Sequence, residues 1–161
     1  KKKISMKIAL YQPDIPQNTG NILRLSACLG FSVDIIEPAG FVFNDRKLKR
    51  SMMDYMQNLE FKRHIDWDAF LIWVKKKKFR LILLTTKSKK SYTSYTFHKN
   101  DILLFGQESA GVPKNIHSLV DERLTIPMVK NLRSINVSSA VAVVAGEVCR
   151  QLRLTELSHF S

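Results

Sequence analysis

Short apolar runs that alternate with helical patterns are the feature that most constrains the fold of this chain. Phe79–Thr86 and Asp101–Gly106 are largely apolar, as is typical of strands buried on both faces of a sheet. Thr19–Leu29 and Ile135–Leu152 show the helical period instead, and the second has a face of small and apolar residues. This alternation predicts an α/β domain with a mostly parallel sheet and helices on both faces.

The same reading assigns an element to most of the chain. Strands are expected at Met6–Tyr11, Phe31–Pro38, Leu59–Ile65, Phe79–Thr86, Asp101–Gly106 and Arg123–Met128, and helices at Thr19–Leu29, Asp45–Met53, Asp66–Lys78, Pro113–Leu119 and Ile135–Leu152. Asn18 is expected to cap the first helix and Gly30 to end it. The length of 161 residues suits a single domain over 1–161. Because Met6 looks like a natural start, residues 1–5 are interpreted as an extension.

Polar and glycine-containing loops follow four of the expected strands. In parallel α/β sheets, ligands bind beyond the carboxyl ends of the strands. The segments Gln12–Arg24, Leu84–Lys87, Gly106–Gly111 and Met128–Asn136 are therefore expected to meet near one rim of the sheet. They carry amides, glycines and Glu108, which is the first indication of a site.

Several common motifs are absent from these loops. The segment Gly106–Gly111 has the glycine spacing of a phosphate loop, but Val112 and Pro113 stand where Lys and Ser or Thr are needed. No GxGxxG follows the first strand, and the chain has no GxSxG or HExxH. Neutral amides and backbone groups suit a neutral or zwitterionic cofactor better than a nucleoside triphosphate.

The chain is strongly basic, with a net charge of +12 and a pI of about 9.9. Such an excess indicates an acidic partner, with nucleic acid first, a membrane surface second and a merely solubilising surface third. Among the basic runs, Lys87–Lys90 follows a strand on the expected rim, whereas Lys75–Lys78 is equally well explained as a solvated helix end. Tyr92 and Tyr95 come next and are candidates for stacking on a base. No apolar run reaches the roughly 20 residues of a membrane span.

Metal and disulfide chemistry have little support in the sequence. Cys28 and Cys149 lie far apart within apolar helical patterns, so we expect buried thiols in a reducing compartment. The four histidines show no ligand spacing, and no metal is expected.

Three segments together resemble a known family. IPQNTGNILRLSA, LLFGQESAGVP and IPMVKNLRSINVSSAVAVVAGEVCRQ are similar to the three motifs of the SPOUT RNA 2′-O-methyltransferases. The likeness is closest to the short TrmL-type members, which methylate the wobble nucleotide of tRNA. It runs from about Met6 to Leu152, with the motifs in order.

The resemblance implies a SPOUT fold with a carboxyl-terminal deep trefoil knot over about residues 80–155. It also implies S-adenosylmethionine as cofactor, S-adenosylhomocysteine as product and a homodimer that completes the site. The implied reaction is 2′-O-methylation of the wobble pyrimidine in the anticodon stem-loop of tRNA, with leucine tRNAs expected, in the cytoplasm. Two alternatives stay open: a nucleotide elsewhere in tRNA or rRNA as the target, and a non-catalytic RNA-binding module on this fold.

The resemblance also implies roles for individual residues. The expected catalytic group is Arg24, Asn18 and Glu108. The expected cofactor contacts are Leu84, Gly106, Ile126, Met128, Ser134 and Asn136. The expected RNA contacts are Lys87, Lys89, Lys90, Arg133 and Arg150.

Some of these roles have competing interpretations. Arg24 occupies the position of the family's catalytic arginine and is expected to reach the site, with the dimer as one route. Because a guanidinium stays protonated, we favour an electrostatic clamp on the 2′-oxygen over a phosphate-assisted base. Glu108 can orient the ribose or the cofactor, or cap a helix, and Arg150 can bind RNA, hold the dimer or form a salt bridge. Gly146 stands where the family usually has tyrosine. The side chain missing there puts the expected RNA contacts or the expected dimer contacts in question.

Overall fold

The computed structural model describes residues 6–42, 55, 57–132 and 134–152. Its centre is a six-stranded sheet with the order β3-β2-β1-β5-β4-β6, and every neighbouring pair of strands is parallel. The strands are β1 (Lys7–Tyr11), β2 (Ser32–Ile36), β3 (Phe61–His64), β4 (Arg80–Leu84), β5 (Asp101–Phe105) and β6 (Glu122–Leu124). The predicted parallel α/β sheet is confirmed.

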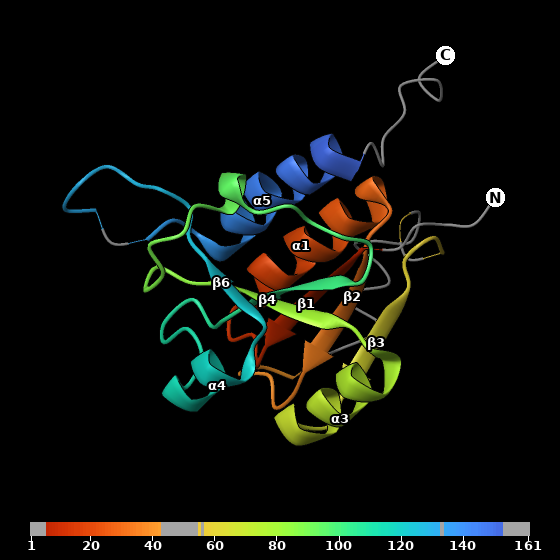
Figure 1. The fold of residues 1–161 in the computed structure, drawn as a ribbon. Coiled ribbons are helices and arrows are strands. Elements are labelled where there is room, and N and C mark those ends of the chain that lie inside the picture. Colours follow the sequence, from red (N-terminus) through yellow and green to blue (C-terminus); the bar gives the residue numbers. More distant parts are fainter. Residues whose placement is uncertain (1–5, 43–54, 56, 133, 153–161) are drawn as a thin grey trace, which may run out of the picture.

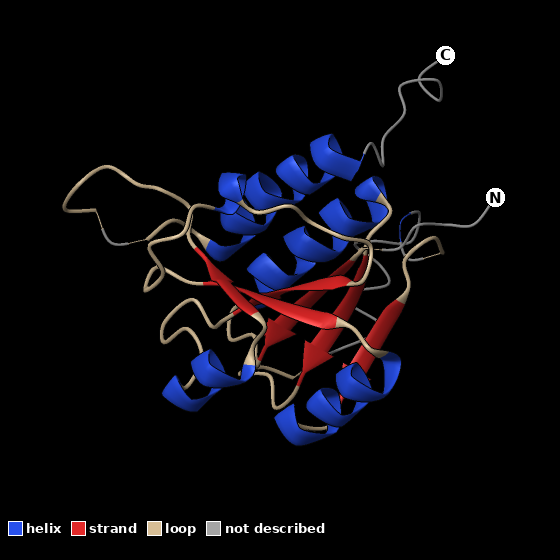
Figure 2. Cartoon of the chain, in the orientation of Figure 1, coloured by secondary structure: helices blue, strands red, loops and turns tan. Residues whose placement is uncertain are grey.

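Helices cover both faces of this sheet, as Figures 1 and 2 show. The helices are α1 (Pro16–Leu29), α3 (Trp67–Lys77), α4 (Lys114–Leu119) and α5 (Val137–Leu152), with a short 3-10 helix η1 (Tyr92–Ser94). Side chains of α1 and α5 share one apolar core with alternate residues of the strands, among them Ile8 and Leu103. Phe70 of α3 and Ile116 of α4 belong to a second core on the opposite face. Helices on both faces were predicted, and this is confirmed.

The first helix begins earlier than the sequence pattern predicts. Pro16 takes the first helical position, where its fixed φ and missing N–H cost nothing, and Ile15 precedes it. Asn18 therefore lies inside the first turn and does not cap it, so the predicted cap is wrong. The predicted end is confirmed, because Gly30 adopts φ 77° and its N–H bonds the carbonyl groups of Ala27 and Ser26.

Two other boundaries affect the site. The last strand was predicted to continue to Met128, but β6 ends at Leu124. Beyond it, Thr125 exchanges backbone hydrogen bonds with Lys90 and Tyr92, so the chain leaves the sheet and joins the loop after β4. The helix predicted at Asp45–Met53 and the extension at residues 1–5 lie outside the described residues. The carboxyl-terminal knot stays a prediction.

The two cysteines differ in exposure. Cys149 is buried in α5, as predicted, but Cys28 is exposed on α1, so the prediction that it is buried is wrong. Cys28 follows the buried Ser26 by two positions, which places it on the opposite side of the helix from the buried face. Within the described ranges, no helix is long and apolar enough to cross a membrane.

Candidate functional site

A cavity of about 320 Å³ lies at the carboxyl ends of β4, β5 and β6. Its walls come from the end of β4 and the loop after it (residues 83–87), the end of β5 and the loop after it (residues 105–112), residues 125, 126 and 128 after β6, and the start of α5. The volume is within the usual range for small-molecule sites, about 300–1,000 Å³. Three of the four loops expected to meet at one rim of the sheet therefore line this cavity, and the fourth, Gln12–Arg24, contacts the loop after β5 through the hydrogen bonds described below.

Five of the six residues predicted to contact a cofactor line this cavity. They are Leu84, Gly106, Ile126, Met128 and Ser134. None of them is fully buried, so they are not simply part of the core. The polar residues Thr85, Gln107 and Ser109 are also among the lining residues. A wall of this mixed kind suits a ligand with both an apolar ring and polar substituents.

The sixth predicted residue, Asn136, belongs to a set of side chains that joins three separate segments of the chain. Its amide nitrogen donates to Asn18 Oδ1 at 3.0 Å, and its own oxygen accepts from the backbone N–H of Ser138 at 2.9 Å, which caps α5. Asn18 Nδ2 in turn donates to the Glu108 carboxylate. Asn18 is only 7% exposed, so this buried amide connects α1, the loop after β5 and the start of α5.

A second carboxylate, Asp14, holds the loop after β5 and was not predicted. Ser109 Oγ donates to Asp14 Oδ2 at 2.6 Å, and the Glu108 backbone N–H donates to Asp14 Oδ1 at 3.4 Å. Gln107 Nε2 adds a bond of 2.9 Å to the carbonyl of Gln12. The available signal was an acidic residue in the loop after the first strand, but its partners lie more than 90 positions away.

Gly106 is required by its own loop. A Cβ added there would lie 2.4 Å from the carbonyl carbon of Gly111, a backbone atom. The backbones of Gln107 and Gly111 exchange two hydrogen bonds of 2.9 Å, which closes the turn beside Gly106. Gly111 itself has φ +64°, a conformation that favours glycine. The predicted need for glycine therefore has a reason within this turn, in addition to the expected approach of a cofactor.

Arg24 does not line the cavity of its own chain. It is exposed on α1, six residues beyond Asn18, with its guanidinium 5.2 Å from the ring of Tyr55. Its Nη2 also lies 3.4 Å from the Tyr55 hydroxyl. Six helical positions correspond to a rotation of about 240° and a rise of about 9 Å, which separates Arg24 from the buried amide.

The residues predicted to contact RNA differ in their position relative to the cavity and in their ion-pair partners. Lys87 lines the cavity and Lys89 is exposed. Lys90 pairs with Glu122 at 2.8 Å, and this bond lowers the pKa of Glu122. Arg150 pairs with Glu147 at 2.7 Å on α5, away from the lining of the cavity. Arg133 lies outside the described residues.

The loop tyrosines pack against the protein itself. Tyr95 lies edge-on to Phe97 at 5.0 Å between ring centroids, and its hydroxyl accepts a bond from Arg80. Burial and the nearby Asp101 carboxylate raise the pKa of Tyr95 to about 12. Tyr92 is half-buried against the core of α1 and α5. Base stacking by these rings stays a prediction.

His117 of α4 is a lining residue that the sequence pattern did not single out. Burial lowers its pKa, and the positive charges of Lys87 and Arg123 lower it further. Gly146, where the family usually has tyrosine, faces open space, since a Cβ there has no atom within 4 Å. The departure therefore leaves the cavity unchanged. The described residues hold no group of three or more His, Cys, Asp or Glu side chains arranged for a metal ion.

A parallel sheet with a polar and apolar cavity beyond its last three strands defines a ligand-binding α/β protein. The model of the SpoU rRNA Methylase family matches residues 5–146, and the chain belongs to this family. The predicted family resemblance is confirmed.

Relatives and solved structures agree with this assignment. A tRNA (cytidine(34)-2′-O)-methyltransferase of Beijerinckia indica subsp. indica is 50% identical over 145 residues, which are 90% of this chain and 91% of the relative. The protein of that name from Escherichia coli K12 is 42% identical over 149 residues, covering 91% and 94% of the two chains. A structure described as giving insight into the 2-OH methylation of C/U34 on tRNA aligns with a TM-score of 0.85 at 37% identity. It covers 92% of this chain and 97% of that one.

The fold extends to more distant proteins. The SpoU methyltransferase AviRb from Streptomyces viridochromogenes, in complex with the cofactor AdoMet, has a TM-score of 0.84 at 23% identity. That comparison covers 95% of this chain and 62% of AviRb. The shared fold supports the prediction of a SPOUT architecture.

Proposed function

We propose that this protein transfers a methyl group from S-adenosylmethionine to the ribose 2′-oxygen of the wobble pyrimidine of tRNA. Two relatives that are 50% and 42% identical over most of both chains carry the name of this activity for cytidine 34. The observation that carries the proposal is the connection of Glu108, Asn18 and Asn136 beside the cavity, because it brings the three motif segments together in one place.

The cavity fits S-adenosylmethionine, a cofactor with an aromatic ring and a charged, polar end. Leu84, Ile126, Met128 and Ser134 line the cavity. In our proposal the first three contact the adenine, and Ser134 makes a polar contact with the cofactor. When bound, the cofactor supplies an electrophilic methyl group. The product is then S-adenosylhomocysteine, and no metal takes part.

The 2′-hydroxyl of ribose is a poor nucleophile unless its developing negative charge is stabilised. Arg24 is our candidate for this role, as a clamp on the oxygen and a neighbouring phosphate. Since Arg24 lies outside the cavity of its own chain, we propose that a second copy in a homodimer brings its Arg24 to this cavity. A phosphate-assisted base remains the competing role.

Glu108 is the one carboxylate among the described residues that line the cavity. It is half-buried, and Asn18 donates to one of its oxygens. A carboxylate fixed in this way can orient the ribose or the positive end of the cofactor. Alignment of the reacting atoms is expected to supply much of the rate.

The substrate assignment includes a finer expectation. Leucine tRNAs, recognised at the anticodon stem-loop, are the proposed substrates, with Lys87 at the cavity as a phosphate contact. A cytoplasmic location belongs to the same proposal, because tRNA is the partner.

Methyl transfer from labelled S-adenosylmethionine to tRNA of a strain lacking the enzyme tests this proposal, with mapping of the modified nucleoside. A 2′-O-methylated pyrimidine at position 34 is expected. Methylation elsewhere in tRNA or rRNA would contradict the substrate, and cofactor binding without any transfer would favour a binding module. Arg24→Ala should retain cofactor binding and lose most transfer. Activity recovered on mixing Arg24→Ala with an inactive Asn18 variant would support a site shared between two copies.

A further inference from the structure

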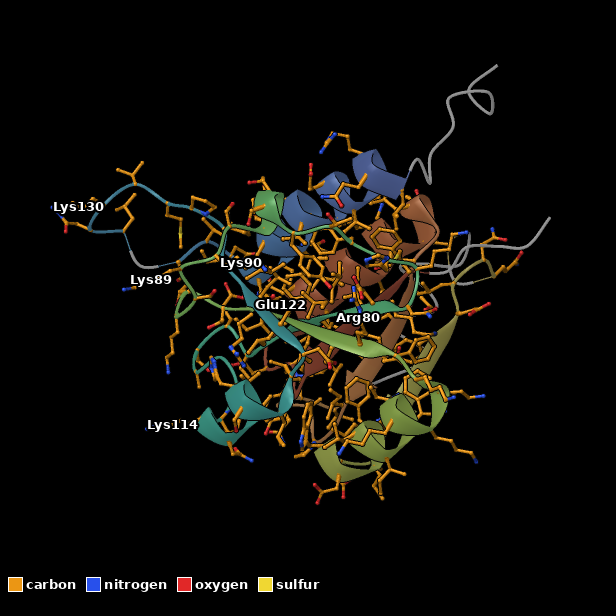
Figure 3. All side chains as sticks on the ribbon, in the orientation of Figure 1. Arg80, Lys89, Lys90, Lys114, Glu122 and Lys130 are labelled. Atoms are coloured by element: carbon orange, nitrogen blue, oxygen red, sulfur yellow. The ribbon has the colours of Figure 1, made fainter. Side chains whose placement is uncertain are left out.

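Three exposed lysines lie along one side of the molecule. The sequence motifs alone do not group them. Lys89 is in the loop between β4 and η1, Lys114 is in the first turn of α4, and Lys130 is in the loop between β6 and α5 (Figure 3). All three are exposed, and their ammonium groups make no hydrogen bond or ion pair with the residues that the structure describes. Lys90, by contrast, pairs with Glu122.

Each of the three lysines is close in sequence to a residue that lines the cavity. Lys89 follows Lys87 by two positions, and Lys130 follows Met128 by two. Lys114 precedes the lining residue His117 by three positions in α4, so both lie on the same side of that helix. The three charges are therefore contributed by three separate elements, each of which also supplies lining residues to the cavity.

Hydrogen bonds hold two of these elements together. Ser88 Oγ donates to the carbonyl of Arg123 at 2.8 Å, and the Thr125 N–H donates to the carbonyl of Lys90 at 2.8 Å. Two carboxylates of this region are already engaged, since Glu122 accepts from Lys90 and Asp121 accepts from the Leu81 N–H at 2.7 Å. The loop after β4 is thus held against β6 and the residue that follows it.

We propose that Lys89, Lys114 and Lys130 contact the RNA phosphate backbone on either side of the nucleotide that enters the cavity. The inference rests on the proposed function and adds Lys114 and Lys130 to the expected RNA contacts. Positive charges on three elements that also line the cavity suit a phosphate backbone that passes over its mouth. Such phosphate contacts position the RNA and carry no sequence information.

The test compares two triple variants of the full chain in tRNA binding across a range of salt concentrations. In Lys89→Gln/Lys114→Gln/Lys130→Gln, the slope of log affinity against log salt should fall in magnitude by about 2 to 3, since each phosphate contact contributes about 0.7 to 0.9. The KM for tRNA should rise at least tenfold, with S-adenosylmethionine affinity unchanged. The matched control, Lys75→Gln/Lys76→Gln/Lys77→Gln on α3, also lowers the net charge by three from +12, and should change neither slope nor KM.

An equal loss in both triple variants would overturn the inference, because net charge alone would then explain binding. An unchanged salt slope in the first variant would also overturn the inference. If the wild type still methylates tRNA normally, the proposed function stands without the inference. A wild type that binds tRNA with the predicted lysine dependence but transfers no methyl group would support the surface while contradicting the function. Lysine-dependent binding to vesicles of anionic lipid, without tRNA binding, would assign the surface to a membrane and contradict the inference.

Discussion

The side-chain amide of Asn18 donates to the carboxylate of Glu108, although 90 positions separate the two residues in the chain. The oxygen of the same amide accepts from Asn136 at 3.0 Å, a further 28 positions on. One buried side chain of α1 thus uses both its donor and its acceptor to join the first, second and third motif segments. The integrity of the site is expected to depend on this amide.

Asn18→Asp tests that dependence with almost no change of shape. The substitution removes the donor and places a carboxylate beside Glu108, so the free energy of unfolding should fall by about 1–3 kcal/mol. Affinity for S-adenosylmethionine, measured by calorimetry, should fall at least tenfold. Asn21→Asp, on an exposed position of the same helix, is the control and should change neither. Wild-type cofactor affinity in Asn18→Asp would show that the amide is not needed.

Gly106→Ala should displace the turn that forms one wall of the cavity. Its Cβ would meet the Gly111 backbone at 2.4 Å, and overpacking of this kind costs about 1–3 kcal/mol. We expect weaker cofactor binding and a lower melting temperature. Gly146→Ala has open space and sits inside α5, so it should raise stability by up to about 1 kcal/mol. Equal stability of the two variants would argue against a close approach at Gly106.

Removal of the positive charge of Lys87 should change the pKa of His117. Because Lys87 contributes to lowering the His117 pKa, Lys87→Met should raise that pKa towards the ordinary value of 6.5. NMR titration of the imidazole measures the change, with Lys77→Met on α3 as control. An unchanged His117 pKa in Lys87→Met would contradict the electrostatic effect of Lys87 on His117.

The lowered pKa of His117 also predicts the direction in which stability changes with pH. A histidine with a lowered pKa in the folded state binds its proton more readily when unfolded. His117 should therefore reduce stability as the pH falls below about 6.5, its ordinary pKa. In Lys87→Met this loss should be smaller.

Glu147 should contribute stability that disappears in acid. Hydrogen bonds from Arg150 and Gln151 lower its pKa from 4.5 to about 2. The contribution is therefore present above about pH 4.5 and is lost as the pH falls towards 2. In urea unfolding between these limits, Glu147→Gln should show a weaker dependence on pH than the wild type. Glu60→Gln, which removes one carboxylate at an exposed position, is the control, and identical curves for all three proteins would contradict the prediction.

Local patterns were enough to predict the sheet and the rim, because buried parallel strands such as β4 and β5 are marked by their apolar runs. They did not predict the interactions of Asn18, whose partners lie far away in the chain. The early start of α1 depended on Pro16, which fits the first helical position better than the loop assigned to it. The relation of Arg24 to the cavity involves a second copy in our proposal, and one chain's sequence contains no geometric signal for that.

The most direct test uses two tRNA substrates that differ by a single oxygen atom. One carries cytidine at position 34 and the other carries 2′-deoxycytidine there, and both are incubated with labelled S-adenosylmethionine. We predict transfer to the first, with the label mapped to the ribose of nucleotide 34, and no transfer to the second, although both bind with similar affinity. Equal labelling of the two substrates would contradict the account, because the methyl group would then be received by a different atom.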